Sequence, residues 1–163
     1  MPDKAIVINT GPLIALIAAT GNLDILKSRY EKTYVTLEVK HEVCFKGQKN
    51  FAVKEFLEAS FLNVVDQPTI LSPILKNSLD KGEASVIQFA LDNQISTVCI
   101  DEIAGRRIAR LHDLKVTGSL GILLKAKSKG ENVSIRQCIS NMEKKGIYLS
   151  AGLISTAIQM SGE

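Results

Sequence analysis

Aromatic residues are scarce in this sequence. The 163-residue chain contains no tryptophan, three tyrosines and five phenylalanines, so aromatic residues make up 5% of it. Proteins that bind single-stranded RNA by stacking use aromatic side chains as a platform for the bases. No such platform stands out along this chain. The aromatic content therefore provides no argument for RNA binding.

Cysteine and histidine are also few. The cysteines, Cys44, Cys99 and Cys138, are odd in number and far apart, and no two have the spacing of a zinc site or a redox pair. We expect them to be buried thiols in a reducing compartment. The only histidines, His41 and His112, belong to no recognisable metal motif. These observations argue against a zinc site and against a Ser-His-Asp triad.

Long apolar runs are absent. The longest apolar-rich run, Pro12 to Ala19, is far shorter than the roughly 20 residues that span a bilayer. The N-terminus, MPDKAIVINTG, has no cleavage-like site after a long apolar segment and so does not resemble a signal peptide. These features predict a cytoplasmic protein with no membrane partner.

The remaining composition is typical of a globular domain. Hydrophobic residues make up 45% of the chain and charged residues 23%, which argues against intrinsic disorder. A chain of 163 residues can bury a substantial core but leaves little room for a second unit. We therefore predict a single domain over residues 1–163, which folds alone or as a homo-oligomer such as a homodimer. The net charge of +3 is too small to establish a nucleic-acid partner.

Short apolar runs alternate with helical patterns along the chain. The run Ala5 to Ile8 is too short for a helix and is bounded by turn residues, as expected of a strand buried on both faces. The alternation predicts an α/β domain with a mainly parallel sheet of about five strands, covered by helices on both faces in three layers. The predicted strands cover residues 5–8, 34–35, 62–65, 97–100 and 115–117. The predicted helices cover residues 12–19, 23–29, 37–47, 52–57, 81–91, 103–112, 122–129, 135–145 and 153–160, with a polar turn over 48–50 and a loop or short helix between Pro68 and Pro73.

Two common uses of such a sheet find no support in the motifs. No G-x-G-x-x-G follows the first strand and no G-x-x-x-x-G-K-[ST] occurs anywhere, which argues against phosphate-binding loops. A receiver domain would have acids after the first strand, where this chain has Asn9 and Thr10. Ligands bind at the carboxyl ends of parallel strands, and the acidic or amide residues at such positions are Asn9, Glu42, Glu83 and Asp101. Oxygen donors of this kind suit Mg²⁺ or Mn²⁺ and phosphate chemistry.

Four segments together resemble the PIN-domain family, and most closely a prokaryotic PIN-like branch related to toxin-antitoxin ribonucleases. The segments are VINTGPLIAL, LDKGEASVIQFAL, VCIDEIAGRRIARL and VTGSLGILLKAKSKG. The resemblance covers essentially the whole chain, including the tail IRQCISNMEKKGIYLSAGLISTAIQ. It implies a metal-dependent ribonuclease fold in which an acid quartet gathers at one end of the sheet.

The resemblance also implies which residues form the site. The positions that match the quartet are Asn9, Glu42, Glu83 and Asp101, as catalytic residues and ligands of Mg²⁺ or Mn²⁺. The family usually has aspartate where this chain has Asn9, which offers a carbonyl oxygen but one negative charge fewer. We expect an endoribonuclease of single-stranded RNA, acting as the toxin of a toxin-antitoxin pair with an antitoxin protein as partner. Asn9 leaves open an alternative, a catalytically weakened module that binds nucleic acid or protein.

Each predicted acid has a structural alternative. Glu42 could be a solvated acid on a helix surface. Glu38 is placed as well as Glu42 in the helical pattern, and the family match alone favours Glu42. Glu83 could compensate the positive end of a helix, and Asp101 could cap the next helix. Both structural roles are compatible with metal ligation. Glu102 is interpreted as a surface acid.

Five further residues are predicted to contact nucleic acid. Arg106 and Arg107 lie early in the helix after the fourth strand, where guanidinium groups could bind the phosphate backbone. Thr117 and Ser119 lie near the end of the fifth strand and could contact a substrate phosphate, although turn roles are the simpler explanation. Thr10 could hydrogen-bond a ligated water or cap the first helix.

Overall fold

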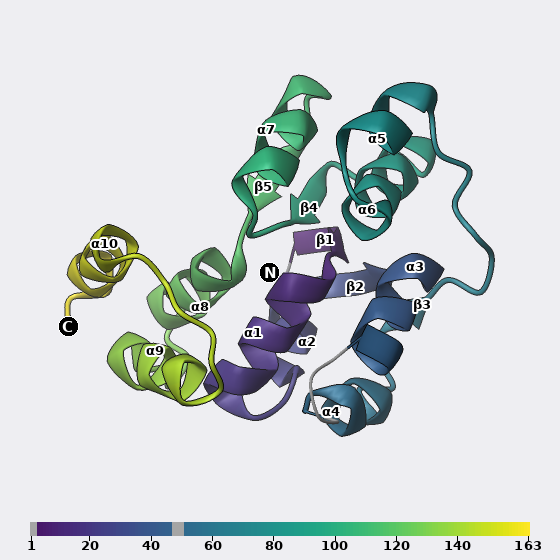
Figure 1. The fold of residues 1–163 in the computed structure, drawn as a ribbon. Helices are drawn as coiled ribbons and strands as arrows, with labels where there is room; N and C mark the ends of the chain where they lie inside the picture. The colour runs from purple at the N-terminus through teal and green to yellow at the C-terminus, as the bar shows by residue number, and fades with distance from the viewer. Residues whose placement is uncertain (1–2, 47–50) are drawn as a thin grey trace.

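The computed structural model describes residues 3–46 and 51–163. The strands in these residues are β1 (Asp3–Ile8), β2 (Tyr30–Val35), β3 (Asn63–Val64), β4 (Thr97–Cys99) and β5 (Lys115–Thr117). They form one parallel sheet in the order β3-β2-β1-β4-β5, with β1 at its centre (Figure 1). The predicted α/β class and mainly parallel sheet are therefore confirmed.

The central strand is the most deeply buried part of the sheet. Residues Ile6 to Ile8 of β1 are fully buried, because helices cover both faces of this strand. Val7 lies opposite Tyr34 of β2 and Val98 of β4. This register places the carboxyl ends of the three strands at the same edge of the sheet, where parallel-sheet proteins bind ligands.

Helices form a layer on each face of the sheet, as the sequence predicts. Their bounds are α1 (Thr10–Thr20), α2 (Asp24–Arg29), α3 (Leu37–His41), α5 (Pro73–Ser78), α6 (Lys81–Asp92), α7 (Ile103–Leu111), α8 (Ser119–Ser128), α9 (Ile135–Lys144) and α10 (Ala151–Ser161). In one layer, α6 packs on β1 and β4 and is flanked by α3, α5 and α7. In the other, α8 contacts α1, α2 and α10, and α9 packs on α1 (Figure 1).

The segment after β2 differs from the prediction. The predicted helix over residues 37–47 is an α-helix only as far as His41, and Glu42–Lys46 form a π-helix, η1. Short π-helical turns are frequent at functional sites. The predicted helix end at Gly47 and the polar turn over residues 48–50 lie outside the described residues. The helix α4 (Val53–Glu58) follows.

Three helices begin earlier than the apolar pattern predicts. α1 begins at Thr10 rather than Pro12, α8 at Ser119 rather than Ile122, and α10 at Ala151 rather than Leu153. The first turns carry polar or small residues, so apolar periodicity does not reveal them. After Pro68 the chain forms the short helix α5, which begins at Pro73. Every helix of residues 3–46 and 51–163 is too short or too polar to span a bilayer.

Candidate functional site

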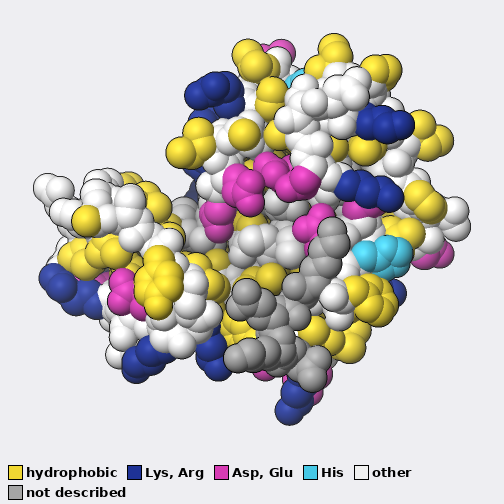
Figure 2. All heavy atoms as spheres, in the orientation of Figure 1, with side chains coloured by type: hydrophobic (Ala, Val, Ile, Leu, Met, Phe, Trp, Pro, Cys, Tyr) yellow, Lys and Arg dark blue, Asp and Glu magenta, His cyan; other side chains and the backbone are white. Residues whose placement is uncertain are grey.

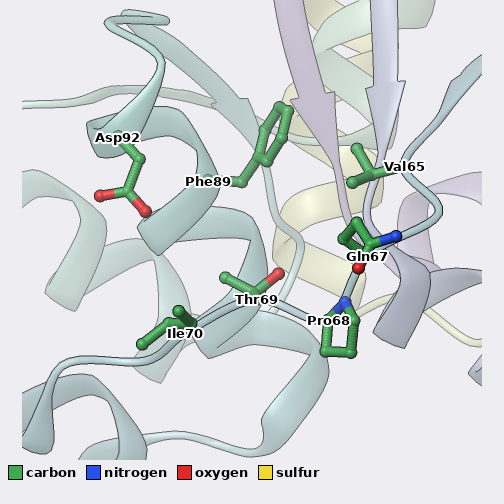
Figure 3. Close-up of a pocket in the computed structure, with 7 residues that line it drawn as sticks. All are labelled: Val65, Gln67, Pro68, Thr69, Ile70, Phe89 and Asp92. Carbon is green, nitrogen blue, oxygen red and sulfur yellow. The ribbon is translucent and has the colours of Figure 1, made fainter.

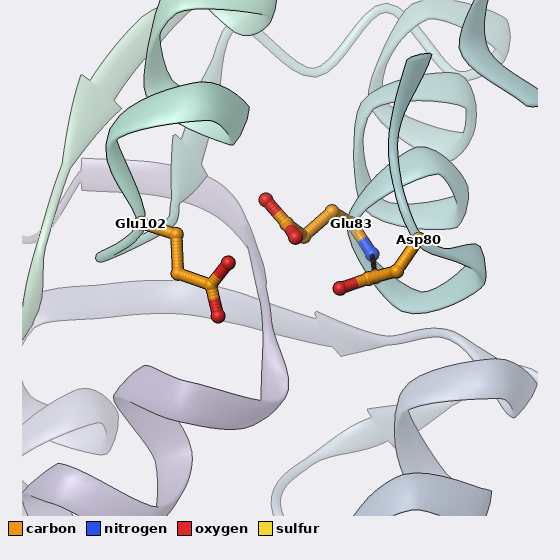
Figure 4. A group of neighbouring side chains, drawn as sticks. All are labelled: Asp80, Glu83 and Glu102. Carbon is orange, nitrogen blue, oxygen red and sulfur yellow. Dashed lines mark hydrogen bonds between the residues drawn. The ribbon is translucent and has the colours of Figure 1, made fainter. Parts of the chain in front are cut away.

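Three acids face one another where α6 and α7 begin. Asp80, Glu83 and Glu102 each offer a carboxylate oxygen, and these oxygens all lie within 4.8 Å of one another (Figure 4). Asp80 is the N-cap of α6, and its Oδ1 accepts a 2.8 Å hydrogen bond from the backbone N–H of Glu83. Glu102 occupies the N-cap position of α7 and points toward the other two acids. We call these three residues the acid group.

Glu83 is the buried member of the acid group. It is 4% exposed, and its Oε2 has no hydrogen-bond partner among the described residues. Burial, followed by the neighbouring carboxyl groups of Asp80 and Glu102, raises the pKa of Glu83 to about 8. At neutral pH this carboxyl group therefore requires either a proton or a nearby cation.

Asn9 stands directly after β1. Its backbone N–H donates a 3.0 Å hydrogen bond to the carbonyl of Cys99, which ties the ends of β1 and β4 together. Asn9 is buried, and its Oδ1 has no hydrogen-bond partner in the part of the chain that the structure describes. Asn9 rather than Thr10 occupies the N-cap position of α1, without a side-chain capping bond. The alternative in which Thr10 caps α1 is therefore wrong.

Glu42 lies against the first turn of α6. Its Oε2 accepts a 2.9 Å hydrogen bond from the hydroxyl of Thr10. Its carboxylate fills the space that a side chain at Gly82 would occupy. Because Gly82 directly precedes Glu83, Glu42 lies beside the acid group without belonging to it.

Glu38, the rival of Glu42, serves another part of the chain. It is buried, and its two carboxylate oxygens accept hydrogen bonds from the backbone N–H of Thr69 at 2.8 Å and from the Thr69 hydroxyl at 3.0 Å. Glu38 therefore anchors the segment between β3 and α5. Of the two acids, Glu42 is the one beside the acid group.

Asp101 is held by the start of α8. Ser119 donates from its backbone N–H to Asp101 Oδ1 at 2.8 Å and from its hydroxyl to Oδ2 at 2.9 Å. A β-carbon at Gly118 would lie 2.6 Å from Asp101 Oδ1 and 2.9 Å from Arg106 Nη1. The N-cap position of α7 belongs to Glu102, so the alternative in which Asp101 caps that helix is wrong.

A comparison with protein families identifies the fold that carries this site. The family model described as PIN domain matches residues 5–163, almost the whole chain. The chain belongs to the PIN-domain family. PIN domains form a superfamily of nucleases, and the resemblance of the four segments is confirmed. No curated protein and no solved structure matches the chain.

The predicted quartet occupies one region of this PIN domain but not one cluster. Glu83 belongs to the acid group, and Glu42 lies beside it. Asp101 directly precedes Glu102, but its carboxylate is bonded to Ser119. The unpaired oxygen of Asn9 lies at the end of the strand that α6 covers.

The sequence did not identify two members of the acid group. Asp80 is predicted only as a helix cap, a role it does have, and Glu102 only as a surface acid. Their nearness in sequence to predicted site acids could have identified them, since Asp80 stands three residues before Glu83 and Glu102 directly follows Asp101. Both acids begin helices, so their side chains project from helix ends rather than from helix faces.

The residues predicted to contact nucleic acid differ in their surroundings. Arg106 is half-buried, and its Nη1 donates a 2.8 Å hydrogen bond to the carbonyl of Ile100. Arg107 is exposed. Thr117 is half-buried and donates a 3.4 Å hydrogen bond to the carbonyl of Gly118. Arg106 is thus fixed near Asp101, whereas Arg107 faces solvent.

Several acidic side chains of the PIN domain gather near the middle of one face, and the lysines and arginines of this face lie mostly toward its margin (Figure 2). A separate hollow of about 230 Å³ is lined by residues outside the predicted site (Figure 3). It is lined by Val65, Gln67, Pro68, Thr69, Ile70, Phe89 and Asp92. Its lining is mainly apolar, so the acidic face is the better candidate for phosphate chemistry.

Proposed function

We propose that this PIN domain is a Mg²⁺- or Mn²⁺-dependent endoribonuclease that hydrolyses phosphodiester bonds in single-stranded RNA. The observation that carries the proposal is Glu83, a buried carboxyl group with an unpaired oxygen that faces two further acids. Membership of a nuclease superfamily supports the same chemistry.

The donor set fits a hard divalent cation. Mg²⁺ and Mn²⁺ prefer oxygen ligands, and Asp80, Glu83 and Glu102 would hold the ion through their carboxylates. Glu42 and the amide oxygen of Asn9 are further donors. A cation would also stabilise the ionised form of Glu83, whose pKa is raised first by burial and then by the neighbouring carboxyl groups. When bound, the ion would polarise a phosphoryl oxygen and lower the pKa of an attacking water.

Neutral and basic side chains would orient the acids and the substrate. The Thr10 hydroxyl fixes one oxygen of Glu42, and Ser119 fixes both oxygens of Asp101. A guanidinium group carries several N–H donors, so Arg106 can bind an RNA phosphate while it keeps its bond to the main chain. Arg107 and Thr117 would extend this phosphate contact along the strand.

Cleavage of single-stranded RNA in Mn²⁺ tests the proposal. Glu83→Gln keeps the shape of the side chain but removes its charge, and it should lower the cleavage rate about 100-fold or more, as expected when a metal ligand worth several kcal/mol is lost. Asp101→Asn should also lose activity. Glu143→Gln, an exposed acid on α9, is the control and should cleave normally. Metal-independent cleavage, no cleavage across varied RNAs, or full activity of Glu83→Gln would refute the proposal.

We propose further that the protein acts in the cytoplasm as the toxin of a toxin-antitoxin pair. The resemblance to toxin-antitoxin ribonucleases supports this role. Expression of the chain should arrest growth, and coexpression of a small acidic protein from the neighbouring reading frame should relieve the arrest. Growth arrest that persists in Glu83→Gln would contradict a nuclease toxin. Light scattering would test whether the active form is a homodimer.

The alternative proposal is a binding module with weakened catalysis, and Asn9 is the residue that favours it. Replacement of the usual aspartate removes one charge where the family carries an acid. Under this alternative, Asn9→Asp should create Mn²⁺-dependent cleavage that the wild-type protein lacks. Strong turnover by the wild-type protein would exclude the alternative.

A further inference from the structure

Gly82 stands where glycine is intrinsically unfavourable. It is the second residue of α6, and it is not among the described glycines with positive φ. Alanine is about 1 kcal/mol more favourable than glycine within a helix. The backbone conformation therefore gives no reason for a glycine at this position.

The absent side chain of Gly82 makes room for Glu42. A β-carbon at this position would overlap Glu42 Oε1 and would lie 2.9 Å from Cδ and 3.1 Å from Oε2. Glu42 Oε2 is also hydrogen-bonded to the Thr10 hydroxyl at 2.9 Å. The carboxylate is thus held between Thr10 and the first turn of α6, one residue from Glu83.

Two other glycines stand in the same relation to acids of the candidate site. A β-carbon at Gly105 would overlap Glu83 Oε2, and one at Gly118 would lie 2.6 Å from Asp101 Oδ1. Nothing lies within 4 Å of a β-carbon at Gly152, which is also the second residue of its helix, α10. A β-carbon at the second residue of a helix therefore need not meet other atoms. The close contact at Gly82 arises because Glu42 lies beside it.

We infer that Gly82 is a positioning residue, which lets the Glu42 carboxylate reach the acid group by presenting hydrogen in place of a side chain. The atoms that a methyl group would meet form the far end of a flexible side chain and not the backbone. Gly82→Ala should therefore move the carboxylate while α6 stays folded. The effect on catalysis rests on the proposed function, whereas the effect on the position of Glu42 does not.

Metal-free crystal structures of Gly82→Ala and Gly152→Ala test the positional effect. Both variants place alanine at the second residue of a helix, and both should unfold at the wild-type temperature or above it. In Gly82→Ala, Glu42 Oε2 should leave Thr10 Oγ1, whereas Gly152→Ala should keep this hydrogen bond. A Gly82→Ala structure in which Glu42 keeps its wild-type position would overturn the inference.

Mn²⁺ titration and RNA cleavage test the functional effect. Gly82→Ala should weaken Mn²⁺ binding and slow cleavage by about tenfold or more, as for other residues that orient metal ligands. Adding Glu42→Asp, which draws the carboxylate back by one methylene, should restore part of the loss, and the two substitutions should be non-additive. If Glu42 moves while Mn²⁺ affinity and cleavage stay at wild-type values, the inference is wrong. If the wild-type protein neither binds Mn²⁺ nor cleaves RNA, the proposed function fails, and the crystal structures alone decide the role of Gly82.

Discussion

Ser119 donates two hydrogen bonds to the carboxylate of Asp101, from its backbone N–H to Oδ1 at 2.8 Å and from its hydroxyl to Oδ2 at 2.9 Å. The two residues follow neighbouring strands, β4 and β5, and Ser119 is 2% exposed. This pair fixes the orientation of Asp101 and joins the two strand ends.

Removing the Ser119 hydroxyl should loosen Asp101. Ser119→Ala keeps the backbone bond but loses the hydroxyl bond to a charged group, so we expect a loss of about 1 to 2 kcal/mol in the free energy of unfolding and, through Asp101, slower RNA cleavage. Urea denaturation measures the first effect. The control is Ser128→Ala, because Ser128 is exposed at the other end of α8 and its hydroxyl donates to the carbonyl of Lys125 in its own helix. Equal stability and equal activity of the two variants would contradict this role.

The raised pKa of Glu83 predicts a pH-dependent stability. The pKa is about 8 in the folded protein against 4.5 as the ordinary value, so the folded state holds a proton that the unfolded state releases between these values. Stability should therefore fall as pH rises from about 4.5 to about 8. Denaturation at a series of pH values should show a steeper fall for the wild-type protein than for Glu83→Gln. Parallel curves for the two proteins would contradict the prediction.

Mn²⁺ should compete with the proton on Glu83. The ion binds the ionised carboxylate, so its affinity should rise with pH up to about 8 and level off above that value. Calorimetric titration at about pH 6, 7 and 8 measures the affinity for Mn²⁺ and the number of protons released on binding. Steps of about one pH unit are fine enough to follow one titrating group. Mn²⁺ affinity that does not change with pH would show that Glu83 takes no part in binding.

Glu163 should stabilise the start of α9 in a pH-dependent way. A hydrogen bond from Lys127 Nζ at 2.6 Å, followed by the backbone N–H of Ile135, lowers the pKa of Glu163 to about 2. The stabilisation should be complete above the ordinary value of 4.5 and should be lost as pH falls toward 2. Glu163→Gln should therefore be less stable than wild type at pH 7, with a difference that shrinks on acidification. Glu143→Gln is the control, and a pH-independent difference would count against the prediction.

Asn9→Asp should lower the stability of the metal-free protein and strengthen its binding of Mn²⁺. A buried carboxylate without a partner is costly, so we expect the variant to have a Tm lower by about 5 °C or more in the absence of metal. Mn²⁺ should then raise the Tm of the variant more than that of the wild-type protein, as scanning calorimetry would measure. Asn77→Asp, an exposed position on α5, should show neither effect. Equal Mn²⁺ shifts for Asn9→Asp and wild type would exclude Asn9 as a metal-site position.

Apolar runs and their alternation with helices were enough to predict the architecture. Ala5 to Ile8 had to be a buried strand, because a four-residue apolar run between turn residues has no other regular structure that buries both faces. The ends of such strands then indicated where Asn9 and Asp101 lie. These are local properties, so a single sequence contains them.

The partners of the acids could not be predicted in the same way. Glu38 and Glu42 are equivalent in the helical pattern, and the two are distinguished by contacts with Thr69 and with Thr10 and Gly82, which are distant in sequence. The bond between Asp101 and Ser119 likewise joins residues 18 positions apart. The direction of a side chain at a helix end depends on how that helix packs against its neighbours. The hydrophobic periodicity of the sequence carries no information about this packing.

The π-helical turn that begins at Glu42 makes the site sensitive to the length of the chain. Such a turn holds one more residue per backbone hydrogen bond than an α-helix, so deletion of one residue within Glu42–Lys46 would let α3 continue as an ordinary helix. Because the π-helical turn accommodates one extra residue, the helix on either side of it would nearly keep its orientation, whereas a deletion within an ordinary α-helix would turn the flanking side chains by about 100°. The residues of the turn itself would change direction, and they include Val43 of the hydrophobic core as well as Glu42. A change of length in this turn would therefore alter the position of Glu42 without any substitution among the acids of the site.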